Sequence, residues 1–208
     1  MGRIRERGSP LDALLPEIAI AAALAWGAGI RLYAVLLLIG VAASFGWLEL
    51  PAHLQVLAHP LVMAASGFMA FVEFFADKIP WVDSLWDAVH TFIRIPAGAA
   101  LAAAVFGDAG AAMAVAAAII GGTIAAGSHL GKAGGRAFLN ASPEPFTNWI
   151  ASLGEDAAVP AGLWLALVHP LVFLALLVLG FAALLLLARR IARGLRTFVA
   201  LIRRPRHP

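Results

Sequence analysis

Long apolar stretches recur along most of the chain, and they constrain its fold more than any other feature of the sequence. Gly, Pro and charged residues divide them into seven segments: Leu11 to Trp26, Ile30 to Trp47, Pro60 to Ala76, Ile93 to Phe106, Ala109 to His129, Ala157 to Val168 and Pro170 to Ala188. Hydrophobic residues make up 62% of the chain and charged residues only 13%, whereas about a quarter of the residues of a soluble domain are charged. We therefore expect an all-α membrane protein, with room for about six spans of roughly 20 residues each.

Lys and Arg are distributed unevenly among the connections between these segments. The connections between the second and third, the fourth and fifth, and the sixth and seventh segments contain neither residue, so all 15 basic residues lie elsewhere. Because Lys and Arg accumulate in cytoplasmic loops, the pattern predicts six transmembrane helices arranged as three hairpins, with cytoplasmic N- and C-termini. The expected domains are a basic cytoplasmic N-terminus (1–10), a single helical membrane domain (11–192) and an Arg-rich cytoplasmic tail (193–208).

The first segment does not fit this scheme as a simple span, because the chain would have to return to the cytoplasmic side before Arg31. We therefore expect a short re-entrant or interfacial helix, interrupted by Pro16 and ended by Gly27-Ala28-Gly29. A cleaved signal peptide is the alternative, because basic residues precede the apolar stretch. Asp12 and Glu17 within the stretch argue against it.

An internal repeat supports the hairpin arrangement. The sequence His-Pro-Leu-Val opens both the third and the seventh segment, at His59 and His169. These positions are consistent with two steps of a period of about 55 residues, in the range where structural repeats occur. Three tandem hairpins and chance similarity among apolar helices both remain open.

Two of the segments are too short to cross a bilayer. The sixth rises about 18 Å at 1.5 Å per residue, against a hydrocarbon core of about 30 Å. To span, it must recruit residues 147–156, and the fourth must reach back toward Trp86. Both extensions bring ionisable side chains to membrane depth, where they are costly and mark functional sites by default.

Acidic pairs are the main candidates for a binding site. Glu73 and Asp77 stand four residues apart and share one helix face, while Glu155 and Asp156 have no basic neighbour in the sequence. These four carboxylates are the candidate metal ligands, with a divalent cation as the candidate ligand. A structural network of ion pairs is the alternative interpretation.

Two further polar regions complete the candidate site. Residues 81–94 form an amphipathic stripe that leads into the fourth segment and either lies in the headgroup region or lines the site. A second polar region follows His129. We expect the ion- or substrate-binding residues to be Glu73, Asp77, Lys78, Asp83, Asp87, His90, Arg94, His129, Lys132, Asn140, Glu144, Asn148, Glu155 and Asp156. The basic members, together with Arg136, would equally suit an anionic or zwitterionic substrate.

Signatures of enzymes are absent from the sequence. There is no G-x-S-x-G elbow, no H-E-x-x-H zinc helix, no phosphate-binding loop and no cysteine. We therefore expect no catalytic residues, no certain cofactor and no nucleic-acid partner. The arginines after Ala188 are expected to contact anionic lipid headgroups, and a homo-oligomer is left open.

Two polar motifs resemble those of a known family. The first is Glu73-Phe-Phe-Ala-Asp-Lys-Ile-Pro80 with the following Asp83, Asp87 and His90, and the second is His129-Leu-Gly-Lys132 with Ser142-Pro-Glu-Pro145. Over residues 27–187 the chain resembles the bacterial membrane family of domain of unknown function 4126. The resemblance implies a multi-pass protein of the bacterial inner (plasma) membrane and brings no established activity.

A looser similarity concerns Glu73 and Asp77-Lys78. They are similar to the Glu-x-Gly-Asp-Lys helix motif of manganese and calcium exporters, although the acids are one residue further apart and Ala76 replaces the glycine. The leading expectation is a small transporter or channel-like protein that moves a cation or small polar solute through a cytoplasm-facing acidic cavity. A non-transporting membrane scaffold or lipid-interacting protein is second, and a membrane enzyme acting on lipid headgroups is third.

Overall fold

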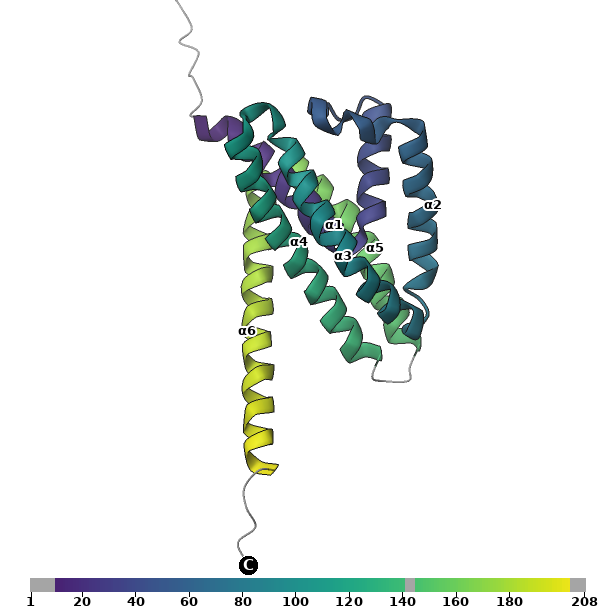
Figure 1. Cartoon of the computed structure of the whole chain (residues 1–208), viewed down its shortest axis with the longest axis vertical. Helices are drawn as coiled ribbons and strands as arrows, with labels where there is room; N and C mark the ends of the chain where they lie inside the picture. The colour runs from purple at the N-terminus through teal and green to yellow at the C-terminus, as the bar shows by residue number, and fades with distance from the viewer. Residues whose placement is uncertain (1–9, 141–144, 203–208) are drawn as a thin grey trace, which may run out of the picture. The chain divides into compact units, whose positions relative to one another are not determined.

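The computed structural model describes residues 10–140 and 145–202, and every regular element within them is a helix. Figure 1 shows these elements: α1 (Pro10–Ser44), the 3₁₀ helix η1 (Ala52–Ala58), α2 (Pro60–Ala76), α3 (Pro80–Val105), the 3₁₀ helix η2 (Gly107–Ala109), α4 (Ala111–Asn140), α5 (Pro145–Val168) and α6 (Pro170–Ile202). The chain divides into two compact units, Met1–Leu174 and Ala175–Pro208.

The described helices are long and apolar enough for a multi-pass membrane protein. By length and composition alone, five of them, α1, α3, α4, α5 and α6, are candidate spans, and η1 with α2, bent by 66°, is a possible sixth. The all-α membrane class and the expected number of about six spans are therefore confirmed.

The fourth and sixth predicted segments, which are too short to cross a bilayer by themselves, belong to helices that begin earlier in the chain. α3 begins at Pro80 and α5 at Pro145, and proline is favoured in the first turn because its missing N–H is not needed there. The amphipathic stretch of residues 81–94 is the first half of α3. Both predicted extensions are confirmed, and ionisable side chains enter the helical unit with them.

The first two predicted segments form the two arms of α1, which join at a break. Arg31 has φ −144° and ψ 72°, outside the helical region. Gly27 and Val35 would lie about 12 Å apart along a straight helix, yet a Cβ on Gly27 would approach Val35 Cγ2 to 2.7 Å. The arms therefore fold toward each other, and in Figure 1 both outer ends lie at the end of the unit that carries η1 and η2, which we call the η end.

The predicted helix end at Gly27-Ala28-Gly29 is thus displaced to Arg31, and Pro16 lies inside the first arm. The reason is that these glycines serve close packing instead of ending the helix. A Cβ on Gly29 would collide with Ser128 Oγ and with the Ala125 carbonyl of α4.

Side chains of α4 satisfy the carbonyl groups that precede the break. Ser128 Oγ donates to the Trp26 carbonyl at 2.9 Å, His129 Nδ1 lies 3.2 Å from the Gly29 carbonyl, and Lys132 Nζ donates to the Ile30 carbonyl at 3.3 Å. Broken backbone at membrane depth requires such partners, because lipid offers none.

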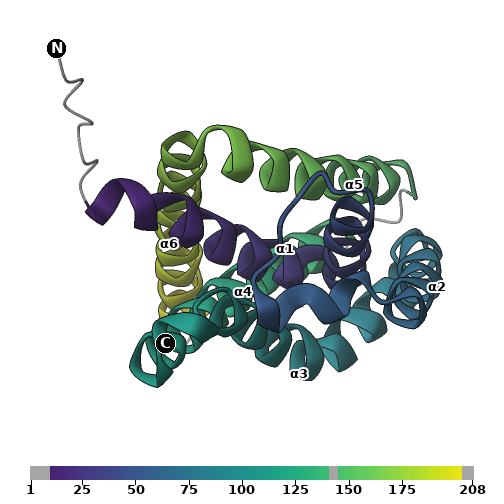
Figure 2. The ribbon, with the colours of Figure 1, turned by 90° about the horizontal axis from the view of Figure 1, so that it is seen from above.

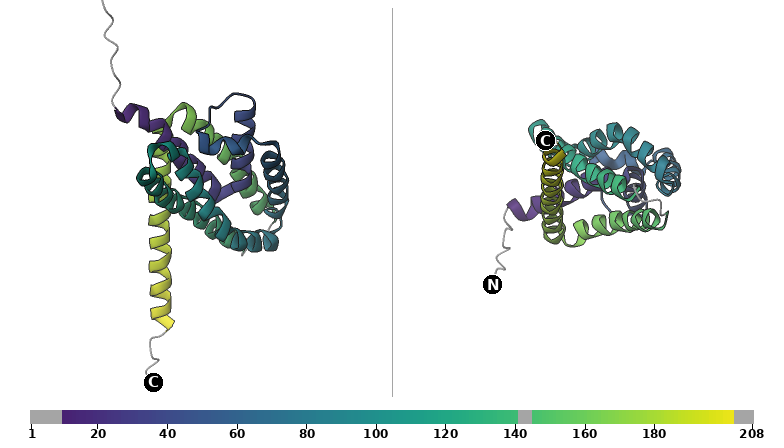
Figure 3. Two further views of the ribbon diagram at one scale, coloured as in Figure 1. Left: turned by 45° about the horizontal axis from the view of Figure 1, so that its top comes forward. Right: turned by 90° about the horizontal axis from the view of Figure 1, so that it is seen from below.

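Small residues let α1, α3 and α4 approach closely, as expected of membrane helices. A Cβ on Gly98 of α3 would collide with Ala125 of α4, and one on Gly121 of α4 would collide with Ala102 of α3. Figures 2 and 3 show α3 and α4 side by side, joined through η2. Gly98 and Gly121 therefore serve close packing between α3 and α4.

The second unit is described as far as Ile202 and continues α6 as a single helix. Its apolar part is followed by Arg189, Arg190, Arg193 and Arg196, and Arg193 Nε donates to the Arg189 carbonyl at 3.3 Å. The predicted Arg-rich tail therefore begins as helix, and residues 203–208 lie outside the described part.

We expect Gly29→Ala to lower the stability of the folded protein by about 1–3 kcal/mol, because the added methyl group meets backbone that cannot move aside cheaply. Gly134→Ala is the matched control, since a Cβ there meets nothing within 4 Å and alanine is the better helix former by about 1 kcal/mol. Unfolding of both variants in detergent, followed by circular dichroism, measures the difference. Equal stability of the two variants would contradict the close packing at the break.

Candidate functional site

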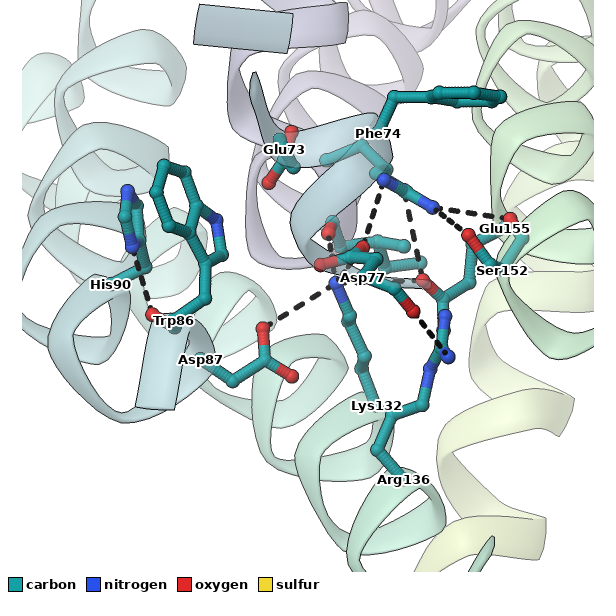
Figure 4. A network of polar contacts seen from close by, with 12 residues as sticks. Glu73, Phe74, Asp77, Trp86, Asp87, His90, Lys132, Arg136, Ser152 and Glu155 are labelled. Carbon is teal, nitrogen blue, oxygen red and sulfur yellow. Dashed lines mark hydrogen bonds and ion pairs between the residues drawn. The ribbon is translucent and has the colours of Figure 1, made fainter. Parts of the chain in front are cut away.

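A cluster of charged side chains lies where five helices meet at the end opposite the η end. It is formed at the break of α1, the C-terminal end of α2, the first half of α3, the last third of α4 and the first half of α5. The charged cluster consists of Arg31, Glu73, Asp77, Lys78, Asp83, Asp87, Arg94, Lys132, Arg136, Glu155 and Asp156. Figure 4 shows part of it, with side chains from these helices pointing toward one another.

Most of these groups are shielded from solvent. Asp77 and Arg94 are both 0% exposed, and Glu155 and Asp156 are the most accessible members. Burying an ion costs several kcal/mol unless an opposite charge and hydrogen bonds compensate it. The pairing within the cluster is therefore a condition for folding.

Asp77 is the central acid of the charged cluster. It forms the C-cap of α2, and its Oδ2 lies 2.8 Å from Arg31 Nη1 and 2.9 Å from Lys132 Nζ. Its backbone carbonyl accepts hydrogen bonds from Asn148 Nδ2 at 3.1 Å and from Arg136 Nη1 at 3.3 Å. One residue thus joins α2 to α1, α4 and α5.

Arg94 forms a second centre within the cluster. Its guanidinium pairs with Glu73 of α2 and with Asp87 Oδ1 at 2.7 Å. Its Nη1 also lies 3.2 Å from His129 Nδ1, and Thr91 Oγ1 lies 2.7 Å from the other ring nitrogen of His129. The predicted candidates Glu73, Asp87, Arg94 and His129 are therefore in direct contact.

The acids of α5 are held by four basic residues, and Lys78 is the most distant of them, at 3.9 Å from Asp156 Oδ2. Arg31 Nη2 lies 3.1 Å from Asp156 Oδ1 and donates to Ser152 Oγ at 2.9 Å. Glu155 receives Arg136 Nε at 2.9 Å and Lys132 Nζ at 3.4 Å. Glu155 and Asp156 lack a basic neighbour in the sequence, and their partners come from α1, from α4 and from the turn between α2 and α3.

The turn between the candidate spans α2 and α3 carries two groups with shifted pKa. Burial raises the pKa of the Asp77 carboxyl, but Lys132 and Arg31 lower it by more, so that its pKa lies below the usual range. Burial lowers the pKa of the Lys78 ammonium, and Asp156 opposes this in part. Lys78 Nζ also lies 3.0 Å from the centre of the Phe74 ring, a favourable cation–π contact.

His90 sits beside the cluster in an aromatic environment. Its ring stacks on Trp86 with centroids 4.1 Å apart, and its Nε2 lies 3.2 Å from the Tyr33 hydroxyl. In Figure 4, His90 and Trp86 lie at the left of the network, close to Asp87.

Three aspartates of α2 and α3 could hold a cation together. Asp77, Asp83 and Asp87 are buried, and each offers a carboxylate oxygen within 4.8 Å of the others. Among the described residues, Asp77 Oδ1 and Asp87 Oδ2 have no hydrogen-bond partner. Carboxylate oxygens are the preferred ligands of hard cations, so this aspartate triad is the part of the cluster best suited to bind one.

The aspartate triad shares only Asp77 with the four metal ligands expected from the sequence. Glu73 is engaged by Arg94, Glu155 by Arg136, and Asp156 by Arg31. These three acids lie in the charged cluster as ion-pair partners.

The structure brings together all the candidate site residues that it describes in full. Lys78 contacts Asp156 at 3.9 Å, and Asn148 contacts Arg136. Asn140 is the last residue of α4, but its side chain lies outside the described part, as does Glu144 altogether.

The sequence analysis did not identify several residues that belong to the charged cluster or contact it. Arg31 served there only to orient the loops, although an arginine inside an apolar stretch is by itself a signal of a buried site. Ser152, Tyr33 and Thr91 carry no charge and gave no signal. Arg136 was considered only as a partner for an anionic substrate, whereas it binds Glu155 and Asn148.

We expect Arg94→Met to destabilise the protein by about 3–5 kcal/mol, because it removes the ion-pair partner of the buried Glu73 and leaves Asp87 with Lys132 alone among the described residues, at 3.4 Å. The double variant Glu73→Gln/Arg94→Met should lose less than the single variant, since the uncompensated charge of Glu73 is removed with the arginine. Arg193→Met, at an exposed position of α6, is the control and should change stability by less than about 0.5 kcal/mol. Unfolding titrations of the variants measure these differences, and an Arg94→Met variant as stable as the control would contradict the pairing.

The comparisons with known proteins give the family of this chain. No curated protein and no solved structure matches it. The family model described as Domain of unknown function (DUF4126) matches residues 18–190, which include every described member of the charged cluster. The chain therefore belongs to the DUF4126 family.

Proposed function

We propose that this protein is a small membrane transporter or channel-like protein in which the charged cluster binds a cation on its way across the bilayer. The observation that carries the proposal is the aspartate triad, with two buried carboxylate oxygens that lack a partner among the described residues. Leaving such atoms unsatisfied is costly, and a bound cation would remove that cost.

The break of α1 at Arg31 supports the same proposal. Membrane transporters use discontinuous helices at their ion sites, because the break exposes backbone dipoles and provides a point of movement. Here the break is linked to the cluster by the side chain of Arg31 and by Lys132, which donates to the Ile30 carbonyl. Both links end on Asp77, a member of the triad.

A membrane scaffold is the second candidate function, because most charges of the cluster have a partner of opposite sign. Ion pairs alone explain the cluster poorly, since apolar residues of similar size would stabilise the helices as well or better. We therefore favour a binding role without a chemical reaction over both the scaffold and an enzyme acting on lipid headgroups.

For orientation, we propose that the cluster end faces the cytoplasm. It carries Arg31, Lys78, Lys132 and Arg136, whereas the η1 and η2 connections contain no Lys or Arg, as the positive-inside rule requires. The first turn of α1 lies at the η end (Figure 1), so this orientation differs from the cytoplasmic N-terminal side expected from the sequence. In the second unit, the exposed arginines of α6 would bind anionic headgroups, at about 1 kcal/mol each.

We expect purified protein in liposomes to conduct or exchange cations, and Asp87→Asn to reduce this flux at least about tenfold, because the loss of one ligand charge at a buried site exceeds about 1.4 kcal/mol. Asp108→Asn is the matched control: this aspartate lies in η2, is 73% exposed and pairs only with His53 at 3.3 Å among the described residues. Flux is measured for Na⁺, K⁺, Mg²⁺, Ca²⁺ and Mn²⁺ with and without a pH gradient.

Absence of flux for every ion in the native chain, with Asp87→Asn merely less stable, would overturn the transport proposal and favour the scaffold. Equal flux through Asp87→Asn and Asp108→Asn, both eluting as the native protein does, would exclude the aspartate triad as the pathway.

The orientation is tested with single cysteines, which is simple because the chain contains none. Val56 in η1 is 61% exposed, and Ile79 in the turn between α2 and α3 is 54% exposed. We expect an impermeant maleimide to label Val56→Cys from outside intact cells and Ile79→Cys only in inverted vesicles. The opposite labelling would reverse the proposed orientation.

A further inference from the structure

Asp77 and Asp87 each use their two carboxylate oxygens differently. Asp77 Oδ2 receives Arg31 and Lys132, and Asp87 Oδ1 receives Arg94 at 2.7 Å and Lys132 at 3.4 Å. The opposite oxygens, Asp77 Oδ1 and Asp87 Oδ2, have no hydrogen-bond partner among the described residues. Because Asp77 is 0% and Asp87 3% exposed, bulk water does not reach them, and they are acceptors directed into the protein.

The charge of the cluster limits what these oxygens can bind. Among the described residues, the charged cluster contains six acidic and five basic side chains, so its formal charge is −1. One monovalent cation makes the cluster neutral, whereas a divalent cation leaves it with an excess positive charge. An uncompensated charge is costly in a buried site, which favours the monovalent ion.

Lys132 is the basic residue that contacts the carboxylates of both Asp77 and Asp87. Its ammonium lies on the same two carboxylates as the proposed ion, at 2.9 Å from Asp77 and 3.4 Å from Asp87. It also contacts Glu155 at 3.4 Å. A second cation on these carboxylates is repelled by the ammonium, and a divalent ion is repelled twice as strongly as a monovalent one.

The ammonium is fixed at this position by the break of α1. Lys132 Nζ donates to the Ile30 carbonyl at 3.3 Å, directly before the non-helical residue Arg31. The side chain of Lys132 is only 2% exposed, so it is held among these acceptors and is shielded from solvent. Its charge therefore stays beside the triad when an ion arrives.

We propose that the aspartate triad binds a monovalent cation and that Lys132 is the specificity-determining residue that excludes divalent cations. This inference rests on the proposed cation-binding function, and it narrows the ligand from cations in general to the monovalent class. It also departs from the divalent ligand that the acid pairs of the sequence suggested.

The test compares cation binding to the native chain, Lys132→Met and Lys78→Met in detergent. Melting temperature is followed against NaCl, KCl, MgCl₂ and CaCl₂ at constant ionic strength set with choline chloride, and binding is measured directly with ²²Na⁺ and ⁴⁵Ca²⁺. Lys78→Met is the matched control, because it removes the same charge from a lysine that contacts Asp156 and Ser152. Lys132→Arg keeps the charge at the site and is the second control.

We expect NaCl or KCl to stabilise the native chain in a saturable manner, with little effect of MgCl₂ or CaCl₂. Lys132→Met should gain affinity for Ca²⁺ or Mg²⁺ by about tenfold or more, since the repulsion removed is larger for the divalent ion. Lys78→Met should gain less, and Lys132→Arg should keep the native preference. If Lys132→Met does not fold, Lys132→Gln replaces it, because its amide can still donate to the Ile30 carbonyl.

The outcomes separate this inference from the function on which it rests. Native protein that binds no cation of either class overturns both. Native protein that binds Ca²⁺ or Mg²⁺ as tightly as Na⁺ or K⁺ overturns the role of Lys132 and leaves cation transport standing. A folded Lys132→Met or Lys132→Gln variant without any gain in divalent affinity has the same consequence.

Discussion

The pairing of Asp77 with Arg31 and Lys132 is the interaction on which the rest of the described structure depends. One carboxylate oxygen receives both cations, at 2.8 and 2.9 Å, and so joins the end of α2 to the break of α1 and to α4. Arg31 and Lys132 continue from there to the acids of α5. Because none of these charges can remain alone in a low-dielectric interior, the helices must meet at this point for the protein to fold.

The break of α1 and the charged cluster are coupled through the side chain of Arg31. An arginine in the middle of an apolar helix must find acids, and the non-helical conformation at Arg31 directs its side chain to Asp77 and Asp156. Carbonyl groups on the N-terminal side of the break accept hydrogen bonds from α4, Trp26 from Ser128 and Ile30 from Lys132. Lys132, which donates to the Ile30 carbonyl, also places its positive charge beside the aspartate triad. The same side chain therefore contacts the break of α1 and accounts for the proposed ion selectivity.

Arguments from length and burial anticipated much of the fold and of the site. The shortness of two apolar segments predicted that α3 and α5 begin among polar residues, because the thickness of a bilayer is fixed. The same argument brought Asp87, Arg94, Glu155 and Asp156 to membrane depth. It could not find the break at Arg31, since glycines at 27 and 29 are the stronger local signal, and only the contact of Gly29 with α4 shows their packing role. Nor could it show that Asp83 and Asp87, and not Glu155, lie close enough to Asp77 for the three carboxylates to approach within 4.8 Å.

The sequence by itself determined that this is a helical membrane protein, about how many spans it has and which ionisable residues enter it, because these follow from composition, segment length and the one-sided distribution of Lys and Arg. Only the tertiary structure decided which acid pairs with which base, where α1 breaks and which carboxylate oxygens have no hydrogen-bond partner among the described residues. These depend on contacts between residues as distant as Arg31 and Ser152, 121 positions apart, and no local pattern encodes which side chains the packing of five helices will bring within about 3 Å.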